Sequence, residues 1–148
     1  MERDKLIQQL DQARGKLKAA LEQIDPQTEL SPGWTTKDTL AHISAWYEVC
    51  VKSLRVLVTG DEPQITVSQG IDAFNDEATA ARNNMSFDEV LQELEANRQH
   101  FKAIIDEMPA KLLSVEFIYP WGVLGTVSGV VNILAEHEEE HVQEIESK

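Results

Sequence analysis

Apolar residues recur at steps of three and four along most of the chain, which is the spacing of amphipathic helices. The first stripe predicts a helix over residues 4–24, which Asp25-Pro26 ends because proline cannot continue it. A second helix is expected to begin at Thr35 or Thr36 and to run as far as Gly60. Both stripes are one-sided, so each helix has a face to bury.

The second half of the chain repeats this pattern. A short helix is predicted over residues 71–82 and a long one over residues 87–108, where Ser86 and Glu89 form a capping box. The last helix is expected over residues 126–145, and the break at Asn83-Asn84 is either a kink or a true loop.

These elements predict an all-α protein, a four-helix bundle with long connections. The run Val115–Tyr119 is the only weak candidate for a strand. No repeat or linker-like stretch divides the 148 residues, so residues 1–148 are interpreted as a single domain.

The charge of the chain limits the classes of partner that it is expected to bind. Twenty-six acidic and 13 basic side chains give a formal net charge of −13, which repels phosphate backbones and predicts no nucleic-acid partner. No stretch reaches the roughly 18 apolar residues of a membrane span, so no membrane partner is expected. The polar first residues lead into no apolar signal core, and a cytoplasmic location is expected. Cys50, the single cysteine, lies on an apolar stripe and is interpreted as a small buried residue.

Two histidines in the last helix are the strongest chemical signal. His137 and His141 are four residues apart and share a helix face with the apolar stripe of Val130, Leu134 and Ile145. They are therefore expected to point inward, with Glu138, Glu139 and Glu146 directed mostly elsewhere. Burying two imidazoles without partners is costly, so something should satisfy them.

A third histidine lies at a matching level of the bundle. His42 is about seven residues, or roughly 10 Å, after the start of its helix, and His141 is about as far from the end of the chain. If the two helices are antiparallel, His42, His137 and His141 converge. Three imidazoles suit zinc, nickel, iron or copper, and leave a position open for catalysis in zinc enzymes. An incidental pair of histidines is the alternative.

Other residues are assigned smaller roles. Asp38, and either Glu136 or Glu140, are the carboxylates expected to orient the imidazoles. Trp46 belongs either to the core or to the wall of a pocket, and His100 is interpreted as an ordinary surface or boundary residue.

Two segments resemble the DinB-like superfamily. The run Pro32–Trp46, which contains Gly-Trp-Thr-Thr-Lys-Asp and Leu-Ala-His, is similar to the family's signature block, and Glu136–His141 is similar to its closing His-x-x-x-His. Phe74-Asn75 and the region 80–82 resemble the middle segment. The resemblance implies a four-helix bundle of DinB/YfiT type with a long crossover, often a homodimer, and a metal triad at His42, His137 and His141.

The same resemblance suggests the chemistry. The superfamily that the chain resembles includes thiol-dependent transferases, which use bacillithiol, mycothiol or glutathione, and a mycothiol-dependent maleylpyruvate isomerase. It also includes resistance proteins that act on electrophilic toxins. The last helix has no basic residue before Lys148 to bind an acidic thiol, which weakens the thiol assignment. Two hypotheses follow. The favoured one is an enzyme that uses a divalent metal, zinc or nickel, and a low-molecular-weight thiol or water to act on a small molecule. The other is a non-catalytic binding or sequestering protein. No catalytic residue beyond the metal ligands is predicted.

Overall fold

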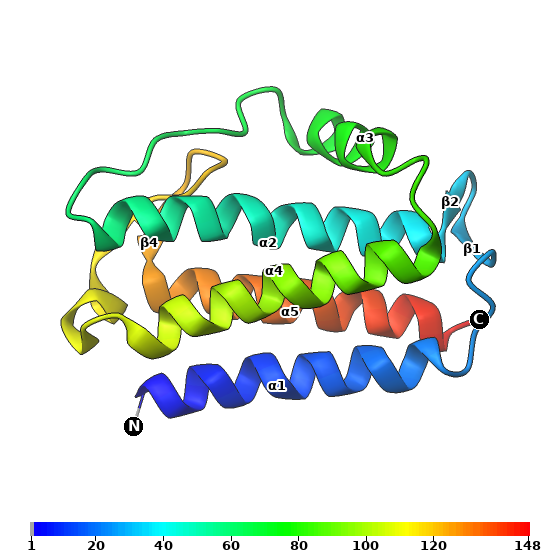
Figure 1. Cartoon of the computed structure of the whole chain (residues 1–148), viewed down its shortest axis with the longest axis horizontal. Coiled ribbons are helices and arrows are strands. Elements are labelled where there is room, and N and C mark those ends of the chain that lie inside the picture. The colour runs from blue at the N-terminus through cyan, green and yellow to red at the C-terminus, as the bar shows by residue number, and fades with distance from the viewer. Residues whose placement is uncertain (1) are drawn as a thin grey trace.

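Four long helices form a bundle in the computed structural model, which describes residues 2–148 (Figure 1). A fifth, shorter helix, α3, lies outside the bundle against α2. The predicted all-α four-helix bundle is therefore confirmed. The helices are α1 (Glu2–Leu21), α2 (Thr36–Val58), α3 (Ile71–Ala81), α4 (Phe87–Glu107) and α5 (Val127–Glu146).

The order of the helices in space requires a long crossover. The helix α1 packs beside α5 and runs in the same direction, while α2 and α4 pack together and run the opposite way (Figure 1). The connection between α2 and α4, residues 59–86 including α3, therefore returns along the whole length of the bundle. As a result, the beginning of α2 and the end of α5 lie at the same end of the molecule.

The ends of the helices follow their capping residues. Thr35 caps α2 and Ser86 caps α4, each in a capping box with the side chain three residues later. The first helix ends at Leu21 rather than at residue 24, because the next residues form turns. The break at Asn83-Asn84 is a true turn between α3 and α4.

Two short hairpins are elements that the helical pattern did not predict, except for the weak strand candidate at residues 115–119. They form within connections, where the chain folds back on itself and pairs its own backbone groups. They are β1 (Glu29–Ser31) with β2 (Trp34–Thr35), and β3 (Glu116–Ile118) with β4 (Leu124–Thr126). Gly33 makes the first turn possible with a φ of 75°. A 3₁₀ helix (Ala110–Ser114) precedes β3.

The long connection is tied to the bundle at several points. The N–H groups of Thr66 and Val67 both donate to the carbonyl of Pro120 in the second hairpin. On α3, Asn75 accepts a hydrogen bond from Trp46 (2.9 Å), and Arg82 after it pairs with Glu93 of α4 (2.7 Å). The connection and the hairpin tip therefore have a fixed position beside α2 and α5.

Cys50 is buried in the core, as the pattern predicted. Burial raises the pKa of its thiol, which keeps the group protonated and unreactive. None of the helices within residues 2–148 carries an apolar stretch long enough to cross a bilayer.

Candidate metal centre

Three imidazole rings converge between α2 and α5. The Nε2 atom of His141 lies 2.7 Å from Nε2 of His42 and 3.1 Å from Nε2 of His137. One ring nitrogen from each of the three histidines lies within 4.8 Å of the others. The antiparallel arrangement of α2 and α5 brings together residues that are about 100 positions apart in the chain. The predicted convergence of His42, His137 and His141 is confirmed.

Burial keeps two of these rings neutral. It lowers the pKa of His42 to about 2, assisted by the neighbouring His141 and His137, and lowers that of His137 to about 4, assisted by His141. Neutral imidazole is the form that binds metal ions. The two rings therefore need no deprotonation at neutral pH before they can act as ligands.

The donor set fits a divalent ion. In a tetrahedral zinc site the metal–nitrogen distance is about 2.0–2.1 Å, which separates two ligand nitrogens by roughly 3.3 Å. The contacts of 2.7 and 3.1 Å are shorter by a few tenths of an ångström, so a small opening of the rings makes room for an ion. Both contacts share Nε2 of His141, and a neutral imidazole nitrogen has either one proton or one lone pair, so without an ion only one of the two contacts can be a regular hydrogen bond.

One carboxylate orients the triad. Both oxygens of Glu144 lie near Nδ1 of His141, at 3.1 and 3.2 Å. A carboxylate at Nδ1 holds the proton there and leaves Nε2 free for a metal. Glu144 was missed in the sequence, although its spacing of three residues from His141 was a usable signal.

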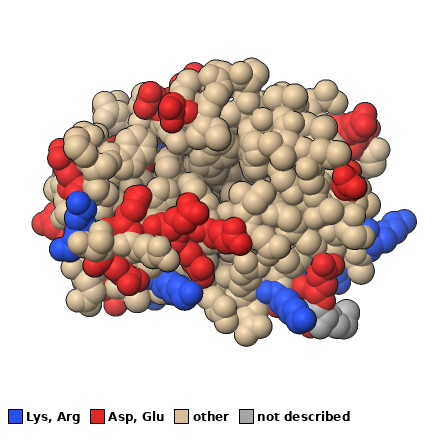
Figure 2. Space-filling view, turned by 180° about the vertical axis from the view of Figure 1, so that it is seen from behind, with Lys and Arg blue, Asp and Glu red and all other residues tan. Residues whose placement is uncertain are grey.

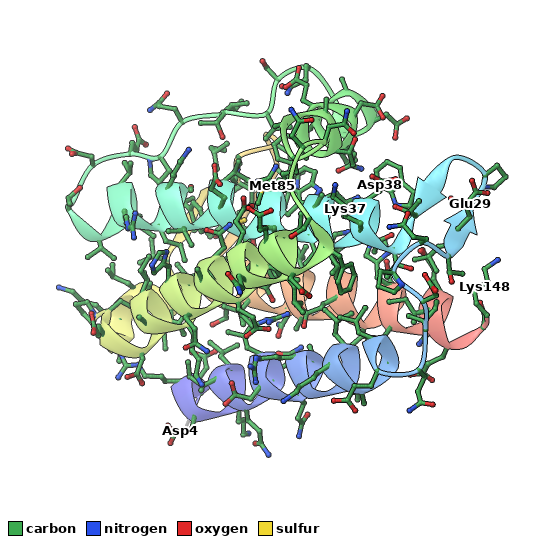
Figure 3. All side chains as sticks on the ribbon, turned by 45° about the vertical axis from the view of Figure 1, so that its right-hand side comes forward. Asp4, Glu29, Lys37, Asp38, Met85 and Lys148 are labelled. Atoms are coloured by element: carbon green, nitrogen blue, oxygen red, sulfur yellow. The ribbon has the colours of Figure 1, made fainter. Side chains whose placement is uncertain are left out.

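The prediction that Asp38 orients a histidine is wrong. Its carboxylate accepts from the backbone N–H of Thr35 (3.0 Å), because it belongs to the capping box at the start of α2. Figure 3 shows Asp38 at this end of the helix, beside the first hairpin. The buried Nδ1 of His42 has no hydrogen-bond partner among residues 2–148, and the ring of Trp34 lies against His42 with 5.5 Å between ring centroids.

The expectation that Glu138 points away from the core is also wrong. Its side chain is fully buried and pairs with Arg98 of α4. The stripe Val131, Ala135, Val142 and Ile145 passes through position 138, so α5 buries two adjacent faces. Glu138 is thus one residue from the triad but belongs to the core.

A pocket of about 310 Å³ opens directly beside the triad. His137 belongs to its wall, so the pocket and the histidines are contiguous. The wall is otherwise mostly apolar, and is made by Trp46, Ile71, Asn75, Trp121, Ile133, Leu134, Glu136 and Glu140. Trp46 packs edge-on against Trp121 of the second hairpin, with 5.4 Å between ring centroids. Trp46 belongs both to the buried core and to the pocket wall, so both alternatives given for it hold.

The surface around this region is acidic. Figure 2 shows a hollow in the face of the molecule opposite to the view of Figure 1, with acidic side chains above it and below it. Glu136 and Glu140 of α5 contribute to the pocket itself. They do not contact the imidazoles through any hydrogen bond within residues 2–148, so their expected orienting role is not what the geometry shows.

A sequence model of the DinB superfamily matches residues 9–145. The chain belongs to the DinB superfamily. No curated protein matches it in sequence.

Solved structures of DinB-like proteins share the fold at low identity. The mycothiol-dependent maleylpyruvate isomerase has a TM-score of 0.82 at 16% identity, and the match covers 97% of this chain and 60% of the isomerase. The chain thus spans only about three fifths of that enzyme.

Two further relatives are similar in length to the chain. YfiT from Bacillus subtilis, described as a probable metal-dependent hydrolase with an unusual four-helix bundle topology, has a TM-score of 0.75 at 18% identity over 98% of this chain and 84% of YfiT. The colibactin self-resistance protein ClbS, solved in complex with double-stranded DNA, has a TM-score of 0.80 at 15% identity over 98% of this chain and 93% of ClbS. These likenesses show a DinB-like fold and no more.

The remaining candidate of the sequence lies outside the centre. His100 is exposed on α4, as predicted, and is not part of the cluster of His42, His137 and His141. The fold of this DinB-superfamily chain thus builds its site from residues near the beginning and near the end of the sequence. Trp121 of the pocket lies in a hairpin, and helical periodicity could not predict the position of that hairpin.

Proposed function

We propose that the protein is an enzyme that uses a divalent metal ion, zinc or nickel, held by His42, His137 and His141, to transfer a thiol to a small electrophile. The convergence of three imidazoles, two of them held neutral by burial, carries this proposal. Structural metal sites are closed by four protein ligands, whereas catalytic ones keep a position open for a reactant. Three histidines beside a pocket match the second description.

The ion would supply Lewis-acid chemistry, because a coordinated thiol or water loses its proton more readily than a free one. The residues of the chain do the rest. Glu144 holds His141 in the tautomer that exposes Nε2, and the apolar pocket excludes water from the apolar part of the electrophile. In the transfer, the sulfur–carbon bond forms, the leaving group departs with its bonding electrons, and the thiol proton goes to solvent.

The pocket constrains the thiol. Its lining residues include no lysine or arginine, and two of them are glutamates. A thiol cofactor with several carboxylates would be repelled, so we favour an uncharged thiol. Attack by metal-activated water, a hydrolysis, is the variant of the same site that needs no thiol.

A non-catalytic binding or sequestering protein is the second candidate. The aromatic pocket favours it, because a pocket of about 310 Å³ walled by two indoles binds an apolar molecule without any reaction. In that case the metal is structural or is not bound.

Metal analysis and turnover distinguish these functions. Wild-type protein loaded with zinc or nickel should hold one ion for each chain, and His42→Ala and the triple histidine-to-alanine variant should hold none. With mercaptoethanol and monochlorobimane, the loaded wild type should accelerate loss of chloride, and His42→Ala should not. Retention of the ion in the triple variant would refute the site. A loaded protein without turnover of any thiol or ester probe would favour sequestration.

The proposed partner is a small molecule. The net charge of −13 continues to predict no affinity for nucleic acid, even though ClbS was solved with DNA. A gel-shift assay at low salt tests this, because electrostatic binding is strongest there.

We also retain the homodimer as a proposal. Ile65 of the long connection and Val123 and Leu124 of the second hairpin are each more than half exposed (53%, 52% and 58%), which is unusual for large apolar side chains. Light scattering of the protein and of Leu124→Asp tests the dimer.

The cytoplasmic location stays a prediction.

A further inference from the structure

The pocket beside the triad combines aromatic walls with uncompensated negative charge. Trp46 and Trp121 present their rings to it, and the carboxylates of Glu136 and Glu140 lie in the same lining. Its lining residues include no positively charged side chain. Aromatic faces and carboxylates together form the environment that favours a cation with an apolar body.

The glutamates of α5 differ in whether they form ion pairs with basic side chains, and this difference bears on what the pocket binds. Glu138 pairs with Arg98, and Glu139 pairs with Lys16 at 3.0 Å. Within residues 2–148, neither Glu136 nor Glu140 forms an ion pair. Glu146, at the end of α5, has no ion pair within the described residues either, but it lies outside the pocket, so Glu136 and Glu140 are the unpaired glutamates of the pocket lining.

The spacing of these glutamates also costs stability. Residues four apart lie above one another on a helix, and like charges at this spacing destabilise it. The fold therefore keeps an unfavourable pair of carboxylates beside an apolar pocket. A positive charge between them would remove the repulsion, which no residue of the pocket lining does.

We infer that this pocket binds a small organic cation, a protonated amine attached to an aromatic or branched apolar group. The ammonium group would lie between Glu136 and Glu140, and the apolar group would pack on Trp46 and Trp121. The pocket volume of about 310 Å³ is large enough for a small amine of this kind. This inference names the substrate class of the proposed metal site, because His137 lines the same pocket.

The hydrogen bond between Trp46 and Asn75 supports this geometry. The indole N–H donates to the Asn75 side chain at 2.9 Å, which fixes the ring orientation. Phe74 packs against the same indole, with ring centroids 4.3 Å apart. A ring fixed in this way is a pre-organised wall, so little side-chain entropy is lost when a ligand binds.

A series of three probes with one shape and different charge tests the inference. Phenethylamine is cationic at neutral pH, phenethyl alcohol is neutral and phenylacetate is anionic. Binding is followed by calorimetry and tryptophan fluorescence, in phosphate buffer without amines and with chelator-treated protein. We expect phenethylamine to bind at least about tenfold more tightly than either analogue, because it alone pairs with the carboxylates. Equal affinities for the amine and the alcohol would overturn the inference.

Variants locate the binding. Glu136→Gln/Glu140→Gln should weaken phenethylamine about tenfold and leave phenethyl alcohol unchanged. Because it removes a repulsion, it should fold at least as well as wild type. The matched control Glu139→Gln/Glu146→Gln makes the same change in net charge on the same helix away from the pocket, and should bind phenethylamine like wild type. If both double variants weaken the amine equally, only the general field of the protein is responsible and the inference fails.

The failure of this inference can be distinguished from the failure of the metal site. His42→Ala should lose zinc and still bind phenethylamine without metal. Glu136→Gln/Glu140→Gln should lose the preference for the amine and still bind zinc at the triad. If zinc binding instead depends on Glu136 and Glu140, the carboxylates are part of a metal site and the inference is overturned.

Discussion

Two polar clusters meet at consecutive residues of α5 and differ in chemistry, because one pairs opposite charges and the other gathers groups of a single kind. His137 belongs to the triad, and Glu138 belongs to a cluster with Arg98, Tyr47 and Glu95. The second cluster pairs its charges among side chains, because Arg98 contacts both carboxylates and Arg14 also pairs with Glu95 at 2.6 Å. The triad gathers three imidazoles, and within residues 2–148 the hydrogen-bonding contacts of their Nε2 atoms are with one another.

By this comparison, the role of the Arg98 cluster is to stabilise the fold. The guanidinium of Arg98 pairs with Glu138 and Glu95 and lies 5.7 Å from the ring centroid of Tyr47. Burial raises the pKa of Glu138, and the charge of Arg98 opposes that rise. Arg98 and Glu138 are almost wholly removed from solvent, so each depends on the other for stabilisation. The opposite charges of the cluster are thus paired, although the Tyr47 hydroxyl, Nε of Arg98 and one oxygen of Glu138 have no hydrogen-bond partner within residues 2–148.

The largest expected effect comes from removing one charge of the Arg98 cluster. Glu138→Ala should lower the free energy of unfolding by about 3–5 kcal/mol, because it removes the buried partner of Arg98 and leaves only the partly exposed Glu95. Urea denaturation of the metal-free protein measures this loss.

Two controls sharpen that result. Glu139→Ala, one residue further, breaks only the partly exposed pair with Lys16 and should cost less than about 1 kcal/mol. The double variant Arg98→Met/Glu138→Leu should recover most of the loss, because apolar residues of similar size replace both charges. If Glu138→Ala were no worse than Glu139→Ala, the contrast between the clusters would be wrong.

Low pH should destabilise the folded protein through the histidine triad. The pKa values of His42 and His137 are lowered to about 2 and about 4, so below pH 6.5 the unfolded chain takes up protons that the folded chain does not. Stability is therefore full above about pH 6.5 and falls as the pH decreases towards the folded-state values. At pH 5 we expect a loss of about 2 kcal/mol for each of these two rings relative to pH 7.

The pH dependence of urea denaturation in chelator, for wild type and His42→Gln, tests this effect. The variant lacks one of the two rings, so its loss between pH 7 and pH 5 should be smaller by about 2 kcal/mol. An identical pH dependence in both proteins would mean that His42 is not held neutral by burial.

The triad could be predicted from sequence because its signal is local and repeated. The spacing of His137 and His141 placed them on one face, and the distances of His42 and His141 from the ends of their helices placed them at one level. Only the direction of α2 relative to α5 had to be supplied, and the fold confirms it.

The Arg98 cluster and the pocket wall were harder to predict for different reasons. Arg98 and Glu138 each occupy an apolar stripe, so opposite charges at stripe positions of two helices were a signal that was overlooked. Trp121 gave no such signal, because its place depends on how the second hairpin pairs and contacts the long connection. Periodicity describes helix faces but not the position of a hairpin tip.

Zinc should stabilise the folded protein by a smaller amount than the loss in Glu138→Ala. At a free zinc concentration about 100 times the dissociation constant, the gain is about 2.7 kcal/mol. Thermal or urea denaturation with and without zinc should show this gain in wild type and not in His42→Ala. Glu139→Ala should keep the whole gain, since its pair is remote from the three rings. Zinc stabilisation of His42→Ala equal to that of wild type would show that the ion binds elsewhere.

The smallest expected effect concerns Glu144, the partly exposed carboxylate that contacts His141 of the triad. Its carboxylate lies 3.1 Å from Nδ1 of His141 and is 45% exposed. Glu144→Gln removes the charge that holds the proton on Nδ1, so His141 should present Nε2 less often as a free ligand. Loss of such an orienting partner typically weakens metal binding about 10-fold or somewhat more. Competition with a chromophoric zinc chelator measures the affinity, with Glu146→Gln as the control for one lost charge on the same turn. If both variants weaken zinc equally, Glu144 contributes only to the general field, and the triad would be oriented by the packing of its rings alone.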